Sequence, residues 1–267
     1  MIQDEPSPQD QPDDARPAPG SAAPNLPVPS PDWALFLDVD GTLVEIASEP
    51  DSVLVGGNLI PLLTDLRTKL EGALALVSGR SIDTLDRLFS PLQLAAAGNH
   101  GLERRDQAGL LQRPDPGAHM PAIRDRMEAF ASRNPGVVVE DKTLSMGLHF
   151  RNCPAAEGPA TELAQELIGE FGDGLFLQKG KMLVEIRPGR GDKGTAIADF
   201  MAEAPFQGRL PVFIGDDVTD ESGFELVNAQ GGHSIRVGNG AKTAARFRVD
   251  DVMGVIRWLE QIVKAER

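Results

Sequence analysis

Two clusters of aspartate residues, far apart in the chain, are the part of the sequence best suited to chemistry. The first is the DVDGTL segment at residues 38–43, and the second is the GDDVTDE segment at residues 215–221. Each directly follows a short apolar run that predicts a buried strand. Because clustered carboxylates repel one another unless a cation holds them together, the pattern predicts a divalent metal site. Catalysis at that site is the second hypothesis.

The spacing of Asp38 and Asp40 suits phosphoryl chemistry. Residues two apart share a face in extended backbone, and the turn at Gly41 lets the two side chains diverge. One carboxylate can then attack phosphorus and form an aspartyl-phosphate while the other transfers protons. Mg²⁺ prefers oxygen ligands of this kind. The candidate ligands are Asp38 and Asp216, with Asp217 and the backbone carbonyl of Asp40 as additional candidates.

Other polar residues follow other predicted strands. Residues 78–80 (SGR) follow an apolar run at 73–77, residues 98–101 (GNHG) follow another at 94–97, and Lys193 opens a predicted helix. Since ligands of parallel α/β sheets bind beyond the carboxyl ends of the strands, these groups should converge on one crevice. There Lys193 would offset the charge of a phosphoryl group, and Ser78 would donate a hydrogen bond to it.

Each of these motifs has a simpler interpretation when it stands alone. An Asp-x-Asp-Gly segment is usually a turn with solvated acids. The GDD at 215–217 is more often a strand-to-helix turn in which an aspartate caps the helix. The SGR at 78–80 is weak evidence for a functional site when it stands alone. The combination of two acidic strand ends, a serine strand end and a lysine at a helix start favours catalysis over coincidence.

The order of the apolar segments predicts an α/β fold with a doubly wound parallel sheet. Near-continuous apolar strands that alternate with amphipathic helices indicate a sheet covered on both faces. The expected strands are 33–37, 73–77, 94–97, 210–214 and 234–237, and the expected helices are 59–70, 82–89, 193–203, 221–228 and 252–262.

The middle of the chain has a different pattern. Helices at 122–132 and 160–171 each precede two strands, 137–140 with 144–150 and 175–178 with 182–186. Two helices with paired strands suggest an α+β unit with an antiparallel sheet, inserted into the parallel core. Residues 1–31 contain nine prolines and almost no large apolar side chain, which predicts disorder. The expected domains are a tail at 1–31, a core of 32–105 with 189–267, and an inserted unit at 106–188.

Composition argues against several classes of function. The 267 residues carry a formal net charge of −14 at pH 7, whereas nucleic acids and anionic membranes require clustered Lys and Arg. Cys153 is the single cysteine, so no intramolecular disulfide can form. No apolar run approaches the roughly 18 residues of a spanning helix, and the first residues lack the pattern of a signal peptide. A cytoplasmic monomer without nucleic-acid or membrane partners is expected.

Taken in order, these motifs resemble those of the haloacid dehalogenase (HAD) superfamily of phosphohydrolases. The superfamily has Asp-x-Asp-Gly-Thr near its start, then a Ser or Thr, a Lys and an acidic motif. The matching positions are Asp38, Ser78, Lys193, Asp216 and Asp220, with Asp217 beside them. The resemblance covers residues 33–260 and implies a Rossmann-like HAD core. The α+β unit is similar to the superfamily's C2-type cap in kind and position.

Within that superfamily, four stretches resemble the trehalose-6-phosphate phosphatases. They are residues 39–43, residues 98–103, residues 140–143 with 149–151, and residues 181–188. The acidic motif in the form GDDVTDE is also typical of that family. The resemblance implies a Mg²⁺-dependent phosphatase that acts on a small sugar phosphate, trehalose 6-phosphate, in the last step of trehalose biosynthesis. Asp192 replaces the commoner Asn before Lys193, which leaves the role of the lysine intact.

The resemblance also implies roles for single residues. Asp38 would be the nucleophile and Asp40 the acid and base, with Lys193 and Ser78 completing the catalytic set. The implied metal ligands are Asp38, Asp40, Asp216, Asp217 and Asp220. The implied substrate contacts are Asp38, Val39, Asp40, Gly79, Arg80, Asn99, His100, Glu140, Lys142, Glu185 and Arg187.

The sequence of residues 182–187 allows a partial check of the implied substrate contacts. Alternation along this strand places Met182, Val184 and Ile186 on a buried face and Glu185 on the opposite face, toward the crevice. Acidic and basic groups on a pocket wall suit a polyhydroxylated ligand. A solvated sheet face with cross-strand ion pairs is an equally good interpretation without the family resemblance. His100 could support its loop or touch the substrate.

The sequence leaves two other functions open. One is another capped sugar phosphatase or a phosphosugar mutase, acting on sucrose 6-phosphate, mannosyl-3-phosphoglycerate or a mannose phosphate. The other is a non-catalytic regulator similar to a response-regulator receiver, which also groups Asp, Thr or Ser, and Lys on a doubly wound sheet. Receivers lack a second acid two residues after the phosphate acceptor and have no inserted unit. Asp40 and residues 106–188 therefore count against the regulator.

Overall fold

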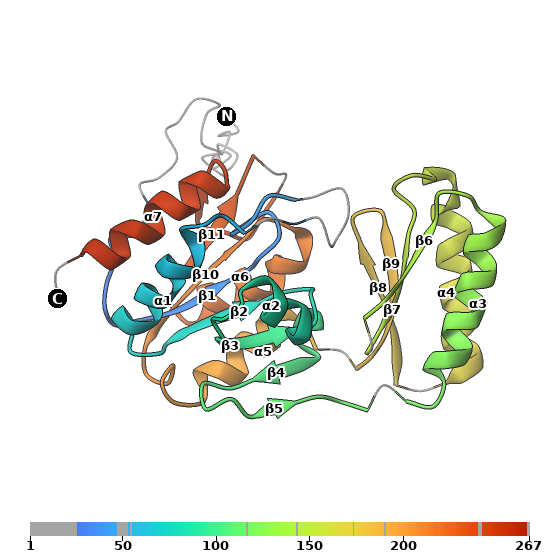
Figure 1. Ribbon diagram of the computed structural model, residues 1–267, viewed down its shortest axis with the longest axis horizontal. Helices are drawn as coiled ribbons and strands as arrows, with labels where there is room; N and C mark the ends of the chain where they lie inside the picture. Colours follow the sequence, from blue (N-terminus) through green and yellow to red (C-terminus); the bar gives the residue numbers. More distant parts are fainter. Residues whose placement is uncertain are drawn as a thin grey trace, which may run out of the picture.

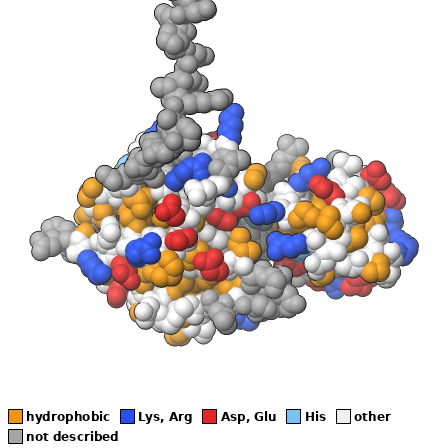
Figure 2. Space-filling model, turned by 90° about the horizontal axis from the view of Figure 1, so that it is seen from above, with side chains coloured by type: hydrophobic (Ala, Val, Ile, Leu, Met, Phe, Trp, Pro, Cys, Tyr) orange, Lys and Arg blue, Asp and Glu red, His pale blue; other side chains and the backbone are white. Residues whose placement is uncertain are grey.

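Two separate β-sheets organise the chain. The computed structural model describes residues 26–46, 53, 55–115, 117–142, 144–172, 174–189, 191–239 and 242–265. Most of the tail expected at 1–31 lies outside these residues. Each sheet has its own hydrophobic cluster, and Figure 1 shows the two sheets side by side with their helices. In Figure 2 they form two masses joined by a narrower waist.

The larger sheet has eight strands in the order β12-β11-β10-β1-β2-β3-β4-β5. The pairs from β12 to β3 are parallel, and β4 and β5 are added antiparallel at one edge. The strands are β1 (Trp33–Leu37), β2 (Leu74–Val77), β3 (Ala95–Gly98), β4 (Glu103–Arg105), β5 (Leu111–Gln112), β10 (Leu210–Gly215), β11 (His233–Val237) and β12 (Phe247–Val249). This order places β1 between β10 and β2, where the chain reverses its direction of winding, and ligands bind at such a point.

Helices cover both faces of the larger sheet, as the fully apolar strand β1 requires. The helices are α1 (Leu59–Lys69), α2 (Ile82–Leu88), α5 (Lys193–Met201), α6 (Glu221–Ala229) and α7 (Val252–Lys264). Trp33 stacks on Trp258 of α7 with ring centroids 5.6 Å apart, whereas Phe36 lies 6.0 Å from Phe200 of α5. Because residues 33 and 36 point to opposite faces of the strand, α7 and α5 cover opposite sides.

The smaller sheet has four antiparallel strands in the order β6-β7-β9-β8. They are β6 (Val138–Asp141), β7 (Met146–His149), β8 (Leu175–Gly180) and β9 (Leu183–Pro188). Helices α3 (Met120–Arg133) and α4 (Glu157–Phe171) cover one face of it (Figure 1). Val184 and Ile186 are buried against these helices, with Met182 partly buried beside them, so the alternation read from the sequence is confirmed.

The α/β class and the order of the expected elements agree with the structure. Strands β4, β5 and β12, of two or three residues each, were not predicted. Short 3₁₀ segments η2 (Asn99–Gly101), η3 (Pro154–Ala156) and η4 (Val218–Asp220) complete the described elements. Residues 111–112 of β5 extend the larger sheet into the range 106–188, although that range was expected to belong to the inserted unit. The structure of the described residues contains no helix with the length and apolarity needed to cross a membrane.

Candidate active site

The polar residues expected to converge do follow strands that end at one edge of the larger sheet. Asp38 follows β1, Ser78 follows β2, and Asp216 follows β10. Leu37 pairs with Ile214, and the Asp38 amide donates a hydrogen bond to the Ile214 carbonyl at 3.0 Å. The two acidic motifs therefore begin at the same level, on neighbouring strands.

Gly41 lets the first acidic loop approach the second one. Its φ angle is +78°, and a Cβ atom at this position would lie 2.2 Å from Oδ2 of Asp216. Any side chain would therefore clash with the carboxylate and would also strain the backbone. This glycine is required by the contact between the two acidic loops.

Lys193 lies between two buried carboxylates. Its Nζ atom is 2.8 Å from Oδ1 of Asp38 and 2.6 Å from Oδ1 of Asp220. The exposed fractions are 2% for Lys193, 4% for Asp38 and 0% for Asp220. Burial lowers the pKa of Lys193, but the carboxylates of Asp220 and Asp38 raise it more, so that it lies above its usual range. The lysine is therefore charged at pH 7.

Asp38, Asp216 and Asp220 form an acidic cluster that could hold a cation. One carboxylate oxygen from each lies within 4.8 Å of the others. Burial raises the pKa of Asp216 to about 6, with Asp220 and Asp217 adding to the shift. Burial also raises the pKa of Asp38, although Lys193 opposes the shift. One lysine does not balance three carboxylates, and an all-oxygen donor set fits a hard divalent cation such as Mg²⁺.

Asp217 and Asp220 also close the turn that follows β10. The Asp217 amide donates to Oδ2 of Asp220 at 2.8 Å, and Oδ1 of Asp217 accepts from the Val218 amide at 2.7 Å. The segment is thus a capped strand-to-helix turn, as one interpretation of the sequence had it, and it also contributes Asp216 and Asp220 to the acidic cluster. A Cβ atom on Gly215 would lie 2.2 Å from Cγ of Asp220, so the glycine leaves the space that this carboxylate fills.

Asp40 is held by an arginine and lies outside the three-carboxylate cluster found among the described residues. Arg80 Nε lies 2.7 Å from Oδ2 of Asp40, and Arg80 Nη2 lies 2.7 Å from Oδ1. Such a two-point bond fixes the plane of a carboxylate as well as its position. The Arg80 amide donates to Oγ of Ser78, which is fully buried, at 3.1 Å. Arg80 thus links two residues to which the sequence assigned catalytic roles.

The His100 ring packs against the SGR turn. A Cβ atom on Gly79 would lie 2.7 Å from Cε1 and Nε2 of that ring, so only glycine leaves room for it. Burial, with Lys142 as the next cause, lowers the pKa of His100 to about 3. The imidazole is therefore neutral at pH 7, and its buried Nδ1 atom has no hydrogen-bond partner among the described residues.

The charged residues of the smaller sheet form one cluster on the face opposite its helices. Gly147 of β7 pairs with Glu140 on one side and Glu185 on the other, which puts the two acids in one row. Lys142 lies 2.8 Å from Glu185 and 3.7 Å from Glu140, and His149 lies 2.7 Å from Glu140. The Lys142 and Glu185 side chains are 11% and 1% exposed. The ion pairs between strands that the sequence analysis considered are therefore present, but Lys142 and Glu185 are buried and not solvated.

The charge of Glu185 interacts with Lys142 of the smaller sheet and with His100 of the η2 loop. Burial raises its pKa, but Lys142 and then His100 lower it more strongly, to about 2. Its Oε1 atom is buried without a hydrogen-bond partner in the described structure. A buried acceptor of this kind can receive a hydroxyl group from a ligand.

A cavity of about 220 Å³ opens between the two sheets. Its lining residues are His100, Gln178, Lys179, Asp192, Lys193, Val218, Thr219 and Ser222. The sequence did not indicate Gln178, Lys179, Thr219 or Ser222. Gln178 pairs with Glu185 across β8 and β9, so the register of that hairpin, once known, places both on one face. Arg187 bonds to the Gln178 side chain and to the Gly191 carbonyl, which joins the smaller sheet to the segment before Lys193.

The parallel sheet, with an acid after β1, an acid after β10 and a lysine at the start of α5, is the HAD fold that the sequence motifs indicated. Comparison with known proteins identifies the family within this class. The family model described as trehalose-phosphatase matches residues 36–253, and the chain belongs to that family. The family resemblance read from the sequence is thus confirmed.

Two curated relatives match most of the chain. Trehalose-6-phosphate phosphatase of Escherichia coli is 45% identical over 236 residues, which are 87% of this chain and 87% of that protein. A probable trehalose-phosphate phosphatase of Sinorhizobium fredii is 44% identical over 206 residues, covering 77% of this chain and 78% of its own length.

Solved structures have the same fold. The C-terminal domain of Candida albicans trehalose-6-phosphate phosphatase has a TM-score of 0.74 at 18% identity, covering 88% of this chain and 92% of that one. A trehalose-6-phosphate phosphatase related protein has a TM-score of 0.73 at 27% identity, covering 86% and 96%.

Replacing Lys193 by Met should destabilise the protein. The variant leaves Asp38 and Asp220 buried without this cation, which costs about 3–5 kcal/mol of unfolding free energy. The loss should shrink as the pH falls below the raised pKa of Asp38, because protonation removes the buried charge. Urea denaturation at pH 7 and pH 5 measures both effects.

The matched control is Lys264→Met, which removes an exposed lysine 3.4 Å from Glu260. It should change the unfolding free energy by no more than about 1 kcal/mol. Equal losses in the two variants would show that Lys193 does not stabilise buried charge.

Proposed function

We propose that this protein is a Mg²⁺-dependent phosphatase that hydrolyses trehalose 6-phosphate to trehalose and inorganic phosphate. The observation that carries the proposal is the buried Asp38–Lys193–Asp220 arrangement beside Asp216, at the point of the sheet where ligands bind. The choice of sugar is supported by the E. coli relative, whose name states that substrate and which is 45% identical.

Asp38 is the nucleophile in this proposal. One of its oxygens forms a bond to phosphorus, and the bond from phosphorus to the sugar oxygen breaks. Lys193 holds the attacking carboxylate at 2.8 Å and offsets the charge that develops on the phosphoryl oxygens. An attacking carboxylate must be ionised, whereas burial raises the pKa of Asp38. A Mg²⁺ ion held by Asp38, Asp216 and Asp220 would favour the ionised form and neutralise phosphoryl charge.

Asp40 transfers the proton in both half-reactions. It gives a proton to the leaving sugar oxygen, then takes one from the water that attacks the aspartyl-phosphate. The two-point bond from Arg80 fixes its carboxylate two residues from the nucleophile. As substrate arrives, the phosphoryl group can draw Arg80 away from Asp40, which would release the carboxylate for proton transfer.

The smaller sheet and its helices act as a cap that selects the sugar. Glu140, Lys142 and Glu185 present two acceptors and a donor on one sheet face, and neutral His100 adds a further polar atom across the crevice. Such groups can each serve several hydroxyls of a disaccharide. We place the domains at residues 32–105 with 189–267 and at residues 106–188, with β5 pairing back to the core sheet.

We further propose that the enzyme works in the cytoplasm as a monomer. Support comes from the net charge of −14, which disfavours nucleic acids and anionic membranes, and from a single cysteine. Size-exclusion chromatography with light scattering tests the oligomeric state.

Asp38→Asn should abolish phosphate release from trehalose 6-phosphate while leaving the protein folded. The amide cannot form the covalent intermediate, so a loss of at least about 10⁴-fold in kcat is expected. The assay measures inorganic phosphate with and without Mg²⁺, alongside circular dichroism. Asp86→Asn, on α2 and away from the acidic cluster, is the matched control.

A panel of sucrose 6-phosphate, mannosyl-3-phosphoglycerate and mannose 6-phosphate accompanies this assay. Turnover of one of these with none of trehalose 6-phosphate would replace the proposed substrate. Wild-type turnover retained in Asp38→Asn would overturn the mechanism, and a stable phosphoprotein without phosphate release would indicate a regulator.

Mg²⁺ should raise the melting temperature of the protein. At about one hundred times its Kd, a ligand of the native state stabilises by about 2.7 kcal/mol, equivalent to roughly 5–10 °C for a chain of this size. Asp216→Asn should remove most of this shift, because it deletes one of the three clustered carboxylates. Differential scanning fluorimetry with Mg²⁺ or a chelator measures the shift, and an equal shift in both proteins would place the ion elsewhere.

Lys142→Met should raise the KM for trehalose 6-phosphate by about 10-fold or more, with a smaller change in kcat, if the smaller sheet binds the sugar. Steady-state kinetics separates the two constants. Lys179→Met tests the cavity wall in the same way, because Lys179 lines the crevice from β8. A fall in kcat alone, with KM unchanged in both variants, would contradict sugar binding by this face.

A further inference from the structure

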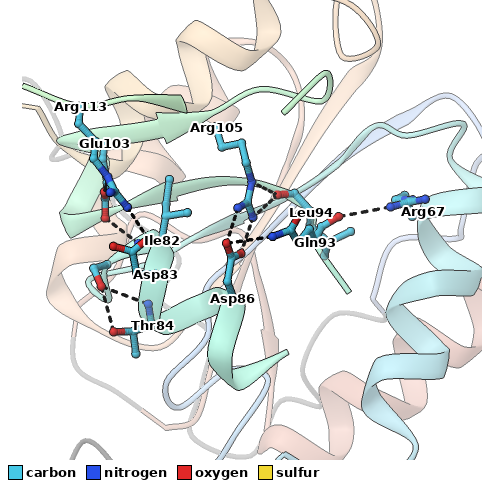
Figure 3. Close-up of polar contacts among 11 residues, drawn as sticks. Arg67, Ile82, Asp83, Thr84, Asp86, Gln93, Leu94, Glu103, Arg105 and Arg113 are labelled. Atoms are coloured by element: carbon cyan, nitrogen blue, oxygen red, sulfur yellow. Dashed lines mark hydrogen bonds and ion pairs between the residues drawn. The ribbon is translucent and has the colours of Figure 1, made fainter. Parts of the chain in front are cut away.

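Glu103 is a buried carboxylate to which the proposed mechanism gives no role. It belongs to β4 and is 1% exposed. Three donors reach it: the Ile82 amide at 2.6 Å, the Asn99 side-chain nitrogen at 3.1 Å, and Nε of Arg113 at 2.6 Å. Figure 3 shows Glu103 between Ile82 and Arg113. A buried charge is costly unless it is bonded in this way, so the three contacts form one satisfied group.

The three donors come from three different functional segments. Ile82 is the first residue of α2 and is separated from the SGR turn by the N-cap residue Ser81, and Asn99 begins the η2 loop that carries His100. Arg113 follows β5, at the start of the chain that leads to α3 and the smaller sheet. Arg113 also bonds to Asp83 in the first turn of α2 at 2.7 Å. One carboxylate thus joins both loops at the crevice and the entry to the smaller sheet.

The two loops also depend on each other. The Asn99 amide donates to the Arg80 carbonyl and the His100 amide donates to the Ser78 carbonyl, both at 2.9 Å. A Cβ atom on Gly98 would lie 2.6 Å from Oε1 of Glu103, so this glycine keeps open the place of the carboxylate. The position of Glu103 therefore affects Ser78 and Arg80 through one loop, and His100 through the other.

Asn99 and His100 adopt backbone angles that need support. Their φ angles are +49° and +55°, in the left-handed region that side chains other than glycine rarely adopt. Such residues persist where the surrounding contacts hold them. The bond from the Asn99 side chain to Glu103 is one of these contacts, and it comes from the residue next to His100.

We propose that Glu103 is a positioning residue, which fixes the Ser78–Arg80 turn and the Asn99–His100 loop for phosphoryl transfer, and that its bond to Arg113 ties both loops to the segment entering the smaller sheet. The inference rests on the proposed function, because it assigns Glu103 to the same reaction. Glu103 acts through Ser78, Arg80 and His100 and does not itself touch the substrate.

A second ion pair on the same strand and helix provides the matched control. Arg105 of β4 bonds to Asp86 of α2 through two contacts of 2.7 Å, and also to the Leu94 carbonyl (Figure 3). This pair joins β4 to α2 as Glu103 does, but its hydrogen bonds among the described residues go to Leu94, Gln93 and each other, not to the SGR turn or the Asn99–His100 loop. Asp86→Asn therefore tests what the loss of a charge between this strand and this helix does by itself.

The experiment compares E103Q, R113Q and D86N with the wild type by three measurements: kcat/KM for trehalose 6-phosphate, melting temperature, and the imidazole NMR signals. The protein has four histidines, so the His100 signal can be resolved and assigned by replacement. E103Q should lower kcat/KM by about 10- to 100-fold, because small displacements of catalytic groups have effects of that size. R113Q should cause a smaller loss, since two donors to Glu103 remain.

E103Q should also move the His100 signal and leave the signals of His119, His149 and His233 in place. D86N should keep kcat/KM within about twofold of the wild type and leave the His100 signal in place, even if its melting temperature falls as far as that of E103Q. An unmoved His100 signal in E103Q would overturn the inference, as would equal losses of kcat/KM in E103Q and D86N. If the wild type does not turn over trehalose 6-phosphate, the proposed function fails, and the His100 signal still decides the positioning role.

Discussion

The buried bond network of Lys193 with Asp38 and Asp220 is the interaction on which the rest of the site depends. Lys193 lies 155 positions from Asp38 in the chain, yet their charged atoms are 2.8 Å apart. Two acids buried this close would repel each other without the lysine between them. The parallel pairing of β1 with β10 brings the acids together, and α5 brings the cation back after the smaller sheet. Gly41 and Gly215 leave the space that the carboxylates of Asp216 and Asp220 fill.

The sequence predicted those parts of the structure that have a local cause. Apolar runs of four to six residues revealed the central strands, and the acids after β1 and β10 predicted a charged cluster because parallel strands end at one edge. Side-chain pairing between distant segments has no local signal. Nothing near Arg80 indicates its bond to Asp40, and nothing near Arg113 indicates Glu103. Strands β4, β5 and β12 are too short to show an alternation of apolar and polar residues, and β5 is exposed.

In the proposed function, the larger sheet carries out the chemistry and the smaller sheet selects the sugar. The larger sheet supplies the acids, the lysine and the serine that a phosphoryl group requires, whatever alcohol it is attached to. The smaller sheet supplies paired charges, of which Lys142 and Glu185 are buried. His100 interacts electrostatically with both of these residues and with Lys193. In the role that we propose for Glu103, its contacts also link the two sheets, because Arg113, which bonds to this carboxylate, lies on the segment that leads to the smaller sheet.

In the proposed mechanism, the phosphoryl group is transferred to Asp38 before it is transferred to water. The stereochemical course at phosphorus distinguishes the two routes, using a trehalose 6-phosphorothioate that carries two different oxygen isotopes at phosphorus and is hydrolysed in water of the third isotope. Two successive in-line displacements each invert the configuration, so a covalent intermediate on Asp38 predicts net retention in the released thiophosphate. Net inversion would show a single attack by water and would contradict the role of Asp38 as nucleophile.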